Sequence, residues 1–323
     1  MRHIVRHISR RETLLVGLAA GAAASLPALA RADATPRAVT PPGMILGEGP
    51  IWSARDNALY WVDIRGKKIH RLNFKDDSQQ SWDTPEIVPW IVERKSGGFL
   101  CAIVRTVYAV SFDPEFKLAP LFSIDGDDKA VRLNDAKVDP MGRLWTGTMD
   151  LPFTDRVAKL YRVDADLSVH TMDTGYICTN GPAFSADGKT LYHNETHDGI
   201  VYAFDLAPDG SLSHKRVFVK FPEGVGFPDG CTTDAQGGLW VSHYGGARVS
   251  RYTPDGKLDF DVPVPAKQST SLTFAGPNLD RLFVTTAAQP PVDADDKLAG
   301  TLFEIPSSSL RGHTGLPMGV FAG

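Results

Sequence analysis

The chain has 323 residues, of which 42% are hydrophobic and 22% charged, and its formal net charge is −4. A slightly acidic chain without a lysine and arginine stripe offers no attractive field to nucleic acid, which argues against a nucleic-acid partner. The 30 glycines and 23 prolines favour a fold with many turns. The length suits one large all-β domain as well as two average domains.

The first thirty residues have the layout of an export signal. Arg10 and Arg11 directly precede an apolar run over residues 14–30, which is too short to span a bilayer comfortably. Small residues then offer cleavage after Ala30 or Ala32. The paired arginines resemble the bacterial twin-arginine (Tat) address, which the Tat export machinery reads.

We therefore predict a Tat-type signal peptide over residues 1–32 and a single mature domain over residues 33–323. The mature protein is expected in the periplasm, without stable membrane association. An uncleaved N-terminal anchor or an amphipathic tail is the alternative to a cleaved signal.

A repeat extends from about residue 45 to about residue 306. Six apolar doublets, each followed by a second strand-like run, recur at intervals of about 40 to 48 residues. The doublets are Leu59-Tyr60, Phe99-Leu100, Leu144-Trp145, Leu191-Tyr192, Leu239-Trp240 and Leu282-Phe283. This period predicts an all-β fold: a six-bladed β-propeller with four antiparallel strands per blade, by default a monomer.

The three cysteines, Cys101, Cys178 and Cys231, are too few for a disulfide framework. A bridge between Cys178 and Cys231 is conceivable, because both lie near the polar motifs of the next paragraph. Isolated cysteines in a β core more often act as small buried hydrophobes, and this is the expected role.

Four segments place an oxygen-bearing side chain 10 or 11 residues before a doublet, in three of them directly beside glycine or proline. These side chains are Glu48, Asn134, Asn180 and Asp229. Because a propeller gathers strands from all blades around one channel, equal offsets predict equal heights in that channel. Two carboxylates with amide oxygens form a hard site suited to a divalent cation. Each segment taken alone also fits an ordinary turn.

The same segments carry a family resemblance. In order and spacing, residues 44–306 resemble the SMP-30/gluconolactonase/regucalcin family through LGEGPIW, RLNDAKVDPMGRLWTGTM, TNGPAFSADGKTLY and FPDGCTTDAQGGLWVSHYGG. The resemblance implies one divalent cation at the channel mouth, held by Glu48, Asn180 and Asp229. It implies that Arg132 and Asn134 hold substrate, and that the reaction is the hydrolysis of sugar lactones.

The chain departs from the family pattern after the fourth doublet. Glu195 stands where many relatives carry aspartate, and its extra methylene, with His193 and His197 nearby, is expected to reshape the substrate pocket. The two histidines are expected at the surface or in the pocket. His243 is a candidate for the pocket wall, with a structural role as the alternative. Asp150 is a candidate for a substrate contact.

A lactone hydrolase needs a polarised carbonyl and an activated water. A cation held by three side chains leaves positions for both. We expect Asp229 to be ligand and catalytic base, a role worth about 10²–10⁴-fold, and Glu48 to be a structural ligand. The sequence leaves the cation open among Ca²⁺, Mg²⁺, Mn²⁺, Zn²⁺ and Fe²⁺.

Two other functions remain open at this point. The same site would also suit other lactones, esters or organophosphates. A non-catalytic propeller stiffened by its metal is the second alternative. A serine hydrolase has little support, because the sequence has no Gly-x-Ser-x-Gly elbow.

Overall fold

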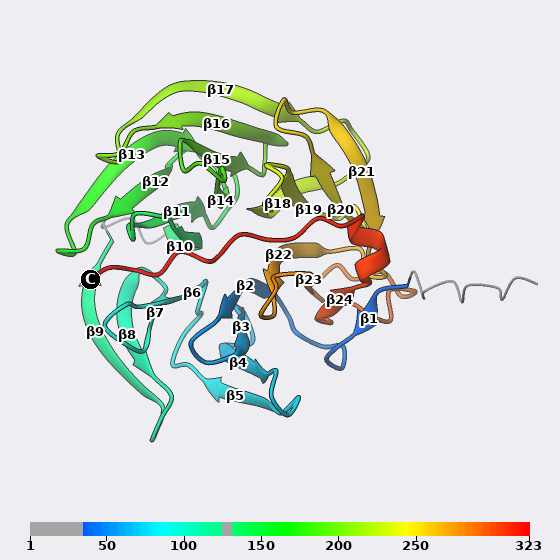
Figure 1. The fold of residues 1–323 in the computed structure, drawn as a ribbon, viewed down its shortest axis with the longest axis horizontal. Coiled ribbons are helices and arrows are strands. Elements are labelled where there is room, and N and C mark those ends of the chain that lie inside the picture. The colour runs from blue at the N-terminus through cyan, green and yellow to red at the C-terminus, as the bar shows by residue number, and fades with distance from the viewer. Residues whose placement is uncertain (1–34, 125–130) are drawn as a thin grey trace, which may run out of the picture. The chain divides into compact units, whose positions relative to one another are not determined.

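A computed structural model describes residues 35–124 and 131–323, and the predicted signal peptide therefore lies outside the described residues. The described residues form six four-stranded antiparallel sheets arranged radially around a channel (Figure 1). This confirms the six-bladed propeller. Within these residues no helix has the length and apolar character needed to cross a bilayer.

The blades follow one another along the chain. The first blade contains β2 (Gly47–Ser53), β3 (Ala58–Asp63), β4 (Lys68–Asn73) and β5 (Gln79–Asp83). The second contains β6 (Ile91–Glu93), β7 (Phe99–Ile103), β8 (Thr106–Ser111) and β9 (Lys117–Ser123). The third contains β10 (Val131–Val138), β11 (Leu144–Asp150), β12 (Ala158–Val163) and β13 (Val169–Tyr176). The fourth contains β14 (Thr179–Phe184), β15 (Thr190–Glu195), β16 (Ile200–Leu206) and β17 (Leu212–Lys220). The fifth contains β18 (Phe227–Thr233), β19 (Leu239–Tyr244), β20 (Arg248–Tyr252) and β21 (Leu258–Pro263).

The sixth blade closes the ring with strands from both ends of the chain. Its sheet order is β22 (Ser269–Ala275), β23 (Arg281–Thr286), β24 (Phe303–Ile305) and β1 (Arg37–Ala38). Arg37 pairs with Glu304 in the register and also donates from Nε to its carboxylate at 3.2 Å. The outermost strand therefore comes from a segment N-terminal to the repeat.

The chain after β24 adds no strand to the last blade and is held against other blades by backbone hydrogen bonds. A short 3₁₀ helix, η1 (Ser307–Leu310), is followed by an extended segment that crosses the centre of the molecule in Figure 1. Isolated bridges join Gly315 to Asp234 and Phe321 to Arg94. The tail therefore connects the fifth blade to the second across one end of the channel.

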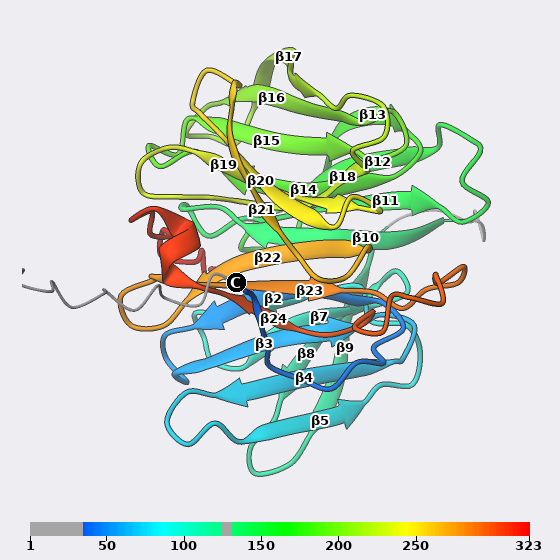
Figure 2. The same ribbon diagram turned by 90° about the vertical axis from the view of Figure 1, so that its right-hand side faces the viewer.

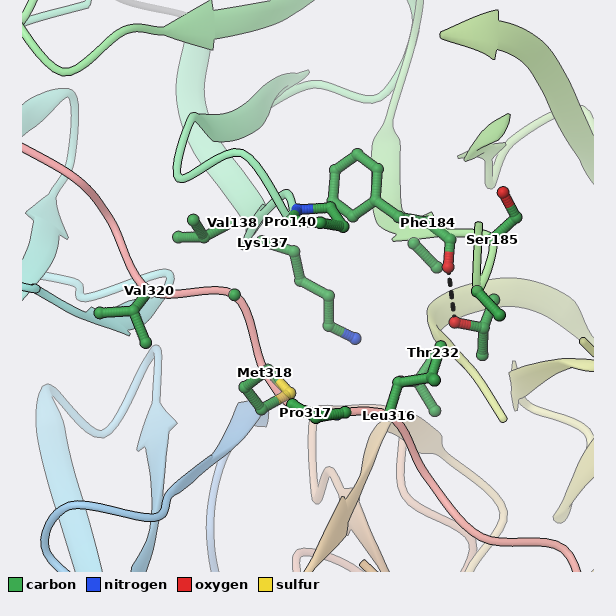
Figure 3. Close-up of a pocket in the computed structure, with 14 residues that line it drawn as sticks. Lys137, Val138, Pro140, Phe184, Ser185, Thr232, Leu316, Pro317, Met318 and Val320 are labelled. Atoms are coloured by element: carbon green, nitrogen blue, oxygen red, sulfur yellow. Dashed lines mark hydrogen bonds between the residues drawn. The ribbon is translucent and has the colours of Figure 1, made fainter. Parts of the chain in front are cut away.

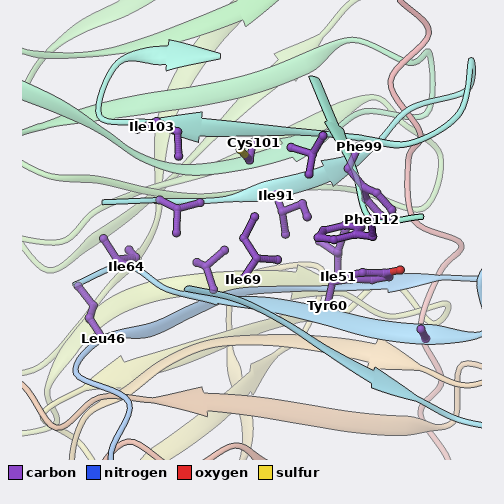
Figure 4. Close-up of a cluster of buried hydrophobic side chains, with 14 of the residues drawn as sticks. Leu46, Ile51, Tyr60, Ile64, Ile69, Ile91, Phe99, Cys101, Ile103 and Phe112 are labelled. Carbon is purple, nitrogen blue, oxygen red and sulfur yellow. The ribbon is translucent and has the colours of Figure 1, made fainter. Parts of the chain in front are cut away.

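The core lies between neighbouring blades, because each blade packs a face against the next (Figure 2). Every doublet lies on the second strand of its blade, and its members are buried. Figure 4 shows the cluster between the first two blades, where the rings of Tyr60 and Phe99 lie 4.5 Å apart. Cys101 belongs to this cluster. All three cysteines are buried and free, so no bridge joins Cys178 to Cys231.

Candidate active site at one mouth of the channel

The four predicted oxygen-bearing residues lie on innermost strands, each at a point where the strand pairing is interrupted. The register shifts directly after Glu48 on β2 and Asn180 on β14, and across Asn134 on β10 and Asp229 on β18. Such bulges redirect a side chain out of the regular alternation of a strand. All four side chains are buried, at 5–7% exposure. The equal offsets in the sequence therefore correspond to equivalent bulges in four blades.

A chain of hydrogen bonds joins the amides across three blades. Arg132 donates from Nη1 to Asn134 Oδ1 at 2.8 Å, and Asn134 Nδ2 donates to Asn180 Oδ1 at 2.7 Å. Asn180 Nδ2 in turn donates to Thr196 Oγ1 at 2.8 Å, which donates to the Pro228 carbonyl at 2.8 Å. These bonds fix the orientation of both amides. The oxygen of Asn180 therefore points toward Asn134, and its nitrogen points toward Thr196.

Three buried carboxylates share the channel. Burial and the charge of Asp135 raise the pKa of Glu48 to about 8. Burial, Glu48 and Asp135 also raise the pKa of Asp229 well above its usual value. Burial raises the pKa of Asp135 itself to about 6, against the opposing charge of Lys137. The carboxylates thus repel one another in a region where water screens their charges poorly.

Arg132 lies near these carboxylates but does not neutralise them all. Its own pKa is lowered to about 10, chiefly by burial. Buried charges are normally paired or bound to metal, because leaving them unpaired costs several kcal/mol. An excess of buried negative charge beside an amide oxygen is therefore a donor set that a divalent cation fits.

The candidate ligands comprise two carboxylates and one amide. Across residues 35–124 and 131–323, no group of three or more histidine, cysteine, aspartate or glutamate side chains is placed to hold a metal ion. Asp135 is a further buried carboxylate in the cluster. Its carboxylate accepts the Ala136 N–H at 2.7 Å and acts on Glu48 and Asp229 through its charge.

Glu195 has a different role from the expected one. Its carboxylate accepts the backbone N–H of Ile177 at 2.9 Å, of Cys178 at 3.3 Å and of His197 at 3.1 Å. It therefore braces the chain immediately before Asn180 and does not reshape the pocket. The longer side chain matters because it reaches these N–H groups.

The other polar residues of interest also have structural roles. The expectation that His193 lies at the surface or in the pocket is wrong: it is buried, with its ring 4.9 Å from that of Tyr176. His243 follows the structural alternative, through hydrogen bonds to the Val225 carbonyl and Ser250. Asp150 accepts two backbone N–H groups of the following turn.

Two residues that contribute to the site were not singled out from the sequence. Asp135 directly follows Asn134 in the motif, and this neighbour was the available signal. Thr196 follows Glu195, and its hydroxyl links Asn180 to the fifth blade. Sequence alone does not tell whether either side chain faces the channel, because Asp135 lies in a bulge and Thr196 lies just beyond the end of β15.

The fold and the site together define a six-bladed propeller with a buried, acidic, oxygen-rich cluster at one mouth of its channel. The model of the SMP-30/Gluconolactonase/LRE-like region matches residues 46–288, and the chain belongs to this family. The predicted resemblance is thereby confirmed.

Relatives of known name align over most of the chain. A 6-deoxy-6-sulfogluconolactonase of Pseudomonas putida is 32% identical over 246 residues, covering 76% of this chain and 84% of its own. The pentonolactonase XacC of Haloferax volcanii is 33% identical over 243 residues, covering 75% and 81%. Among solved structures, a calcium-binding regucalcin from Agrobacterium tumefaciens superimposes with a TM-score of 0.83 at 25% identity, covering 90% and 98%.

Proposed function

We propose that this protein hydrolyses sugar lactones to the corresponding sugar acids, with one divalent cation held by Glu48, Asn180 and Asp229. The observation that carries the proposal is the pair of buried carboxylates, Glu48 and Asp229, whose mutual repulsion no cationic side chain of the described residues offsets fully. Two relatives over 30% identical are lactonases by name, which supports the same reaction class here.

The bound cation would polarise the lactone carbonyl and acidify a water molecule. Asp229 is suited to receive the proton of the attacking water, because its carboxylate is buried in the same cluster as Glu48 and would lie beside the bound cation and its water. As the water oxygen bonds to the carbonyl carbon, the bond from that carbon to the ring oxygen breaks. The proton held at the Asp229 carboxylate then passes to the released ring oxygen, which becomes a hydroxyl.

Arg132 and Asn134 have distinct tasks in this scheme. Arg132 uses Nη1 for Leu133 and Asn134, which leaves its other N–H groups for substrate oxygens. The Asn134 amide is already occupied by Arg132, Asn180 and the Thr179 carbonyl, so it acts as a positioning residue. Its predicted role in holding substrate is thus exerted through Arg132 and Asn180.

The test is acid release from glucono-1,5-lactone, followed with a pH indicator above the spontaneous rate. The protein is stripped of metal, and Ca²⁺, Mg²⁺, Mn²⁺, Zn²⁺ and Fe²⁺ are added back singly. Activity should require a cation and be lost in Asp229→Ala, while Asp255→Ala, an exposed control, retains it. Cation-independent hydrolysis, or full activity of Asp229→Ala, would refute the proposed chemistry.

Other outcomes identify the alternatives. Activity only toward an aryl ester or a phosphotriester would indicate that the same site acts on a different class of substrate. Cation binding without hydrolysis of any of these compounds would indicate a non-catalytic propeller.

We also infer that the protein is exported by the Tat route to the periplasm. The inference is supported by the twin arginines and the short apolar run that follows them. In a bacterial host, the double variant Arg10→Lys/Arg11→Lys should keep the uncleaved chain in the cytoplasm. Periplasmic recovery of that variant at the normal level would contradict the Tat route.

A further inference from the structure

A cavity lies at the opposite end of the channel from the candidate active site. It is lined by the last residues of three innermost strands, Val138 on β10, Phe184 on β14 and Thr233 on β18. Each of these residues follows a site residue of the same strand by four positions. The cavity therefore occupies the far end of the channel, and its volume of about 480 Å³ is within the usual range for small-molecule pockets, about 300–1,000 Å³.

The C-terminal tail forms the roof of this cavity. Residues 316–320 line it, and Figure 3 shows Leu316, Pro317, Met318 and Val320 along the tail beside the cavity. The tail is anchored on either side of this stretch: Gly315 N donates to the Leu279 carbonyl at 2.7 Å and Phe321 N to the Glu93 carbonyl at 2.9 Å. Between these anchors, residues 316–320 form no backbone hydrogen bond with other described residues. The roof is therefore fixed by its two ends and by side-chain contacts such as that of Met318 with Thr273.

Lys137 is the charged group of this cavity. Among the described lining residues no other side chain is charged, and Figure 3 shows the lysine extending into the middle of the space. The side chain is only 9% exposed. Its ammonium donates to the Cys231 carbonyl, and no described carboxylate forms an ion pair with it. An ammonium carries three N–H donors, so two remain for a ligand.

The rest of the lining is mostly apolar. Val138, Phe184, Leu316, Pro317, Met318 and Val320 supply the apolar surface. A polyhydroxylated sugar acid would lose hydrogen bonds with water at such walls, and a phosphate dianion would meet only one cation. A monocarboxylate with a hydrocarbon body matches both the single ammonium and the apolar surface, and its hydrogen bond to the ammonium is of the strong, charge-assisted kind.

We propose that this cavity is a binding site for a small apolar monocarboxylate, whose carboxylate is held by Lys137 and whose hydrocarbon body lies under residues 316–320. The proposal assigns the chain a ligand site separate from the lactone site. It does not depend on the proposed lactonase activity.

The probe is hexanoate, titrated into the full mature protein by isothermal titration calorimetry. Hexanamide, the neutral analogue, and gluconate, the polar one, serve as ligand controls. Hexanoate should bind with one-to-one stoichiometry and a Kd of about 1 mM or tighter, and both controls at least about tenfold more weakly. Absence of saturable hexanoate binding, or equal binding of hexanamide, would overturn the proposal.

Variants locate the binding. Lys137→Met should weaken hexanoate binding at least about tenfold, whereas Lys189→Met, which removes an exposed lysine from the neighbouring β14–β15 turn, should leave it unchanged. If Lys137→Met does not fold, Leu316→Trp fills the cavity from the roof and should abolish binding with Lys137 in place. Undiminished binding in a folded Lys137→Met or Leu316→Trp variant would place the ligand elsewhere and refute the proposal.

Discussion

Replacing Glu48 by glutamine should stabilise the metal-free protein. Burial, followed by the charge of Asp135, raises the pKa of Glu48 from 4.5 to about 8. Because the folded state holds this proton more tightly than the unfolded state, the stability of the metal-free protein is full below pH 4.5 and falls as the pH rises toward 8. Between pH 4.5, the usual pKa of the group, and pH 7, the free energy of unfolding therefore falls by roughly 3 kcal/mol.

The glutamine keeps the shape of the side chain and one important contact. Glu48 Oε2 accepts the Gly49 N–H at 2.8 Å, and an amide oxygen can accept the same bond. The substitution also removes one of the charges that raise the pKa of Asp229. We therefore expect Glu48→Gln to gain about 1–3 kcal/mol at pH 7 in the presence of a chelator, and almost nothing at pH 4.5.

Urea unfolding at pH 4.5, 6 and 7.5 measures this difference, with Glu223→Gln as an exposed control. Saturating cation should make the wild-type the more stable of the two proteins. A cation at one hundred times its Kd stabilises the wild-type by about 2.7 kcal/mol, and it should stabilise Glu48→Gln much less, because this variant lacks one ligand. A Glu48→Gln protein that is no more stable than wild-type at pH 7.5 without metal would refute the reasoning. So would equal stabilisation of both proteins by the cation.

Three other substitutions test separate parts of the structure. Phe321→Ala should cost about 3–5 kcal/mol in guanidinium unfolding, because the ring is fully buried in an inter-blade cluster, and a loss under 1 kcal/mol would contradict its anchoring role. Asn134→Ala should lower kcat about 10- to 100-fold, since it breaks the link between Arg132 and Asn180, and wild-type kcat in the folded variant would refute the positioning role. Burial lowers the pKa of His193 from 6.5 to about 3, so wild-type stability should fall as the pH drops through this range. At pH 5 this loss in the free energy of unfolding amounts to about 2 kcal/mol, and His193→Phe should not show it. Parallel pH profiles of the free energy of unfolding for wild-type and variant would contradict the prediction.

The fold was predictable because its signal repeats. Six doublets at one period correspond to the second strand of six blades, and any one of them alone would have indicated only a strand. The outermost strand of the last blade, Arg37–Ala38, was not predictable, because two residues carry no periodic pattern. The crossing of the channel by residues 315–321 is set by contacts with distant blades, to which the local sequence gives no guide.

The candidate site was predictable to the extent that bulges repeat. Glu48, Asn180 and Asp229 have nearly the same offset from their doublets because each lies at a similar bulge. The direction of individual side chains was not predictable in the same way. His193 and Glu195 are two residues apart on β15, yet one is buried inside the blade and the other binds backbone N–H groups beside the site.

The blade faces carry the apolar core, and the channel strands carry the buried polar and charged side chains. The apolar clusters lie between blades, whereas β10 alone places Arg132, Asn134, Asp135 and Lys137 along the channel, all with less than 10% exposure. Along this strand a cation, an anion and a second cation alternate, and Lys137 opposes the rise in the pKa of Asp135 that burial causes. Since packing between blades supplies the stability, the inner strands can hold an acidic cluster at one mouth of the channel and, further along β10, a buried ammonium that partly offsets its charge. The same division explains why removing a carboxylate from this channel should strengthen the fold while it weakens the site.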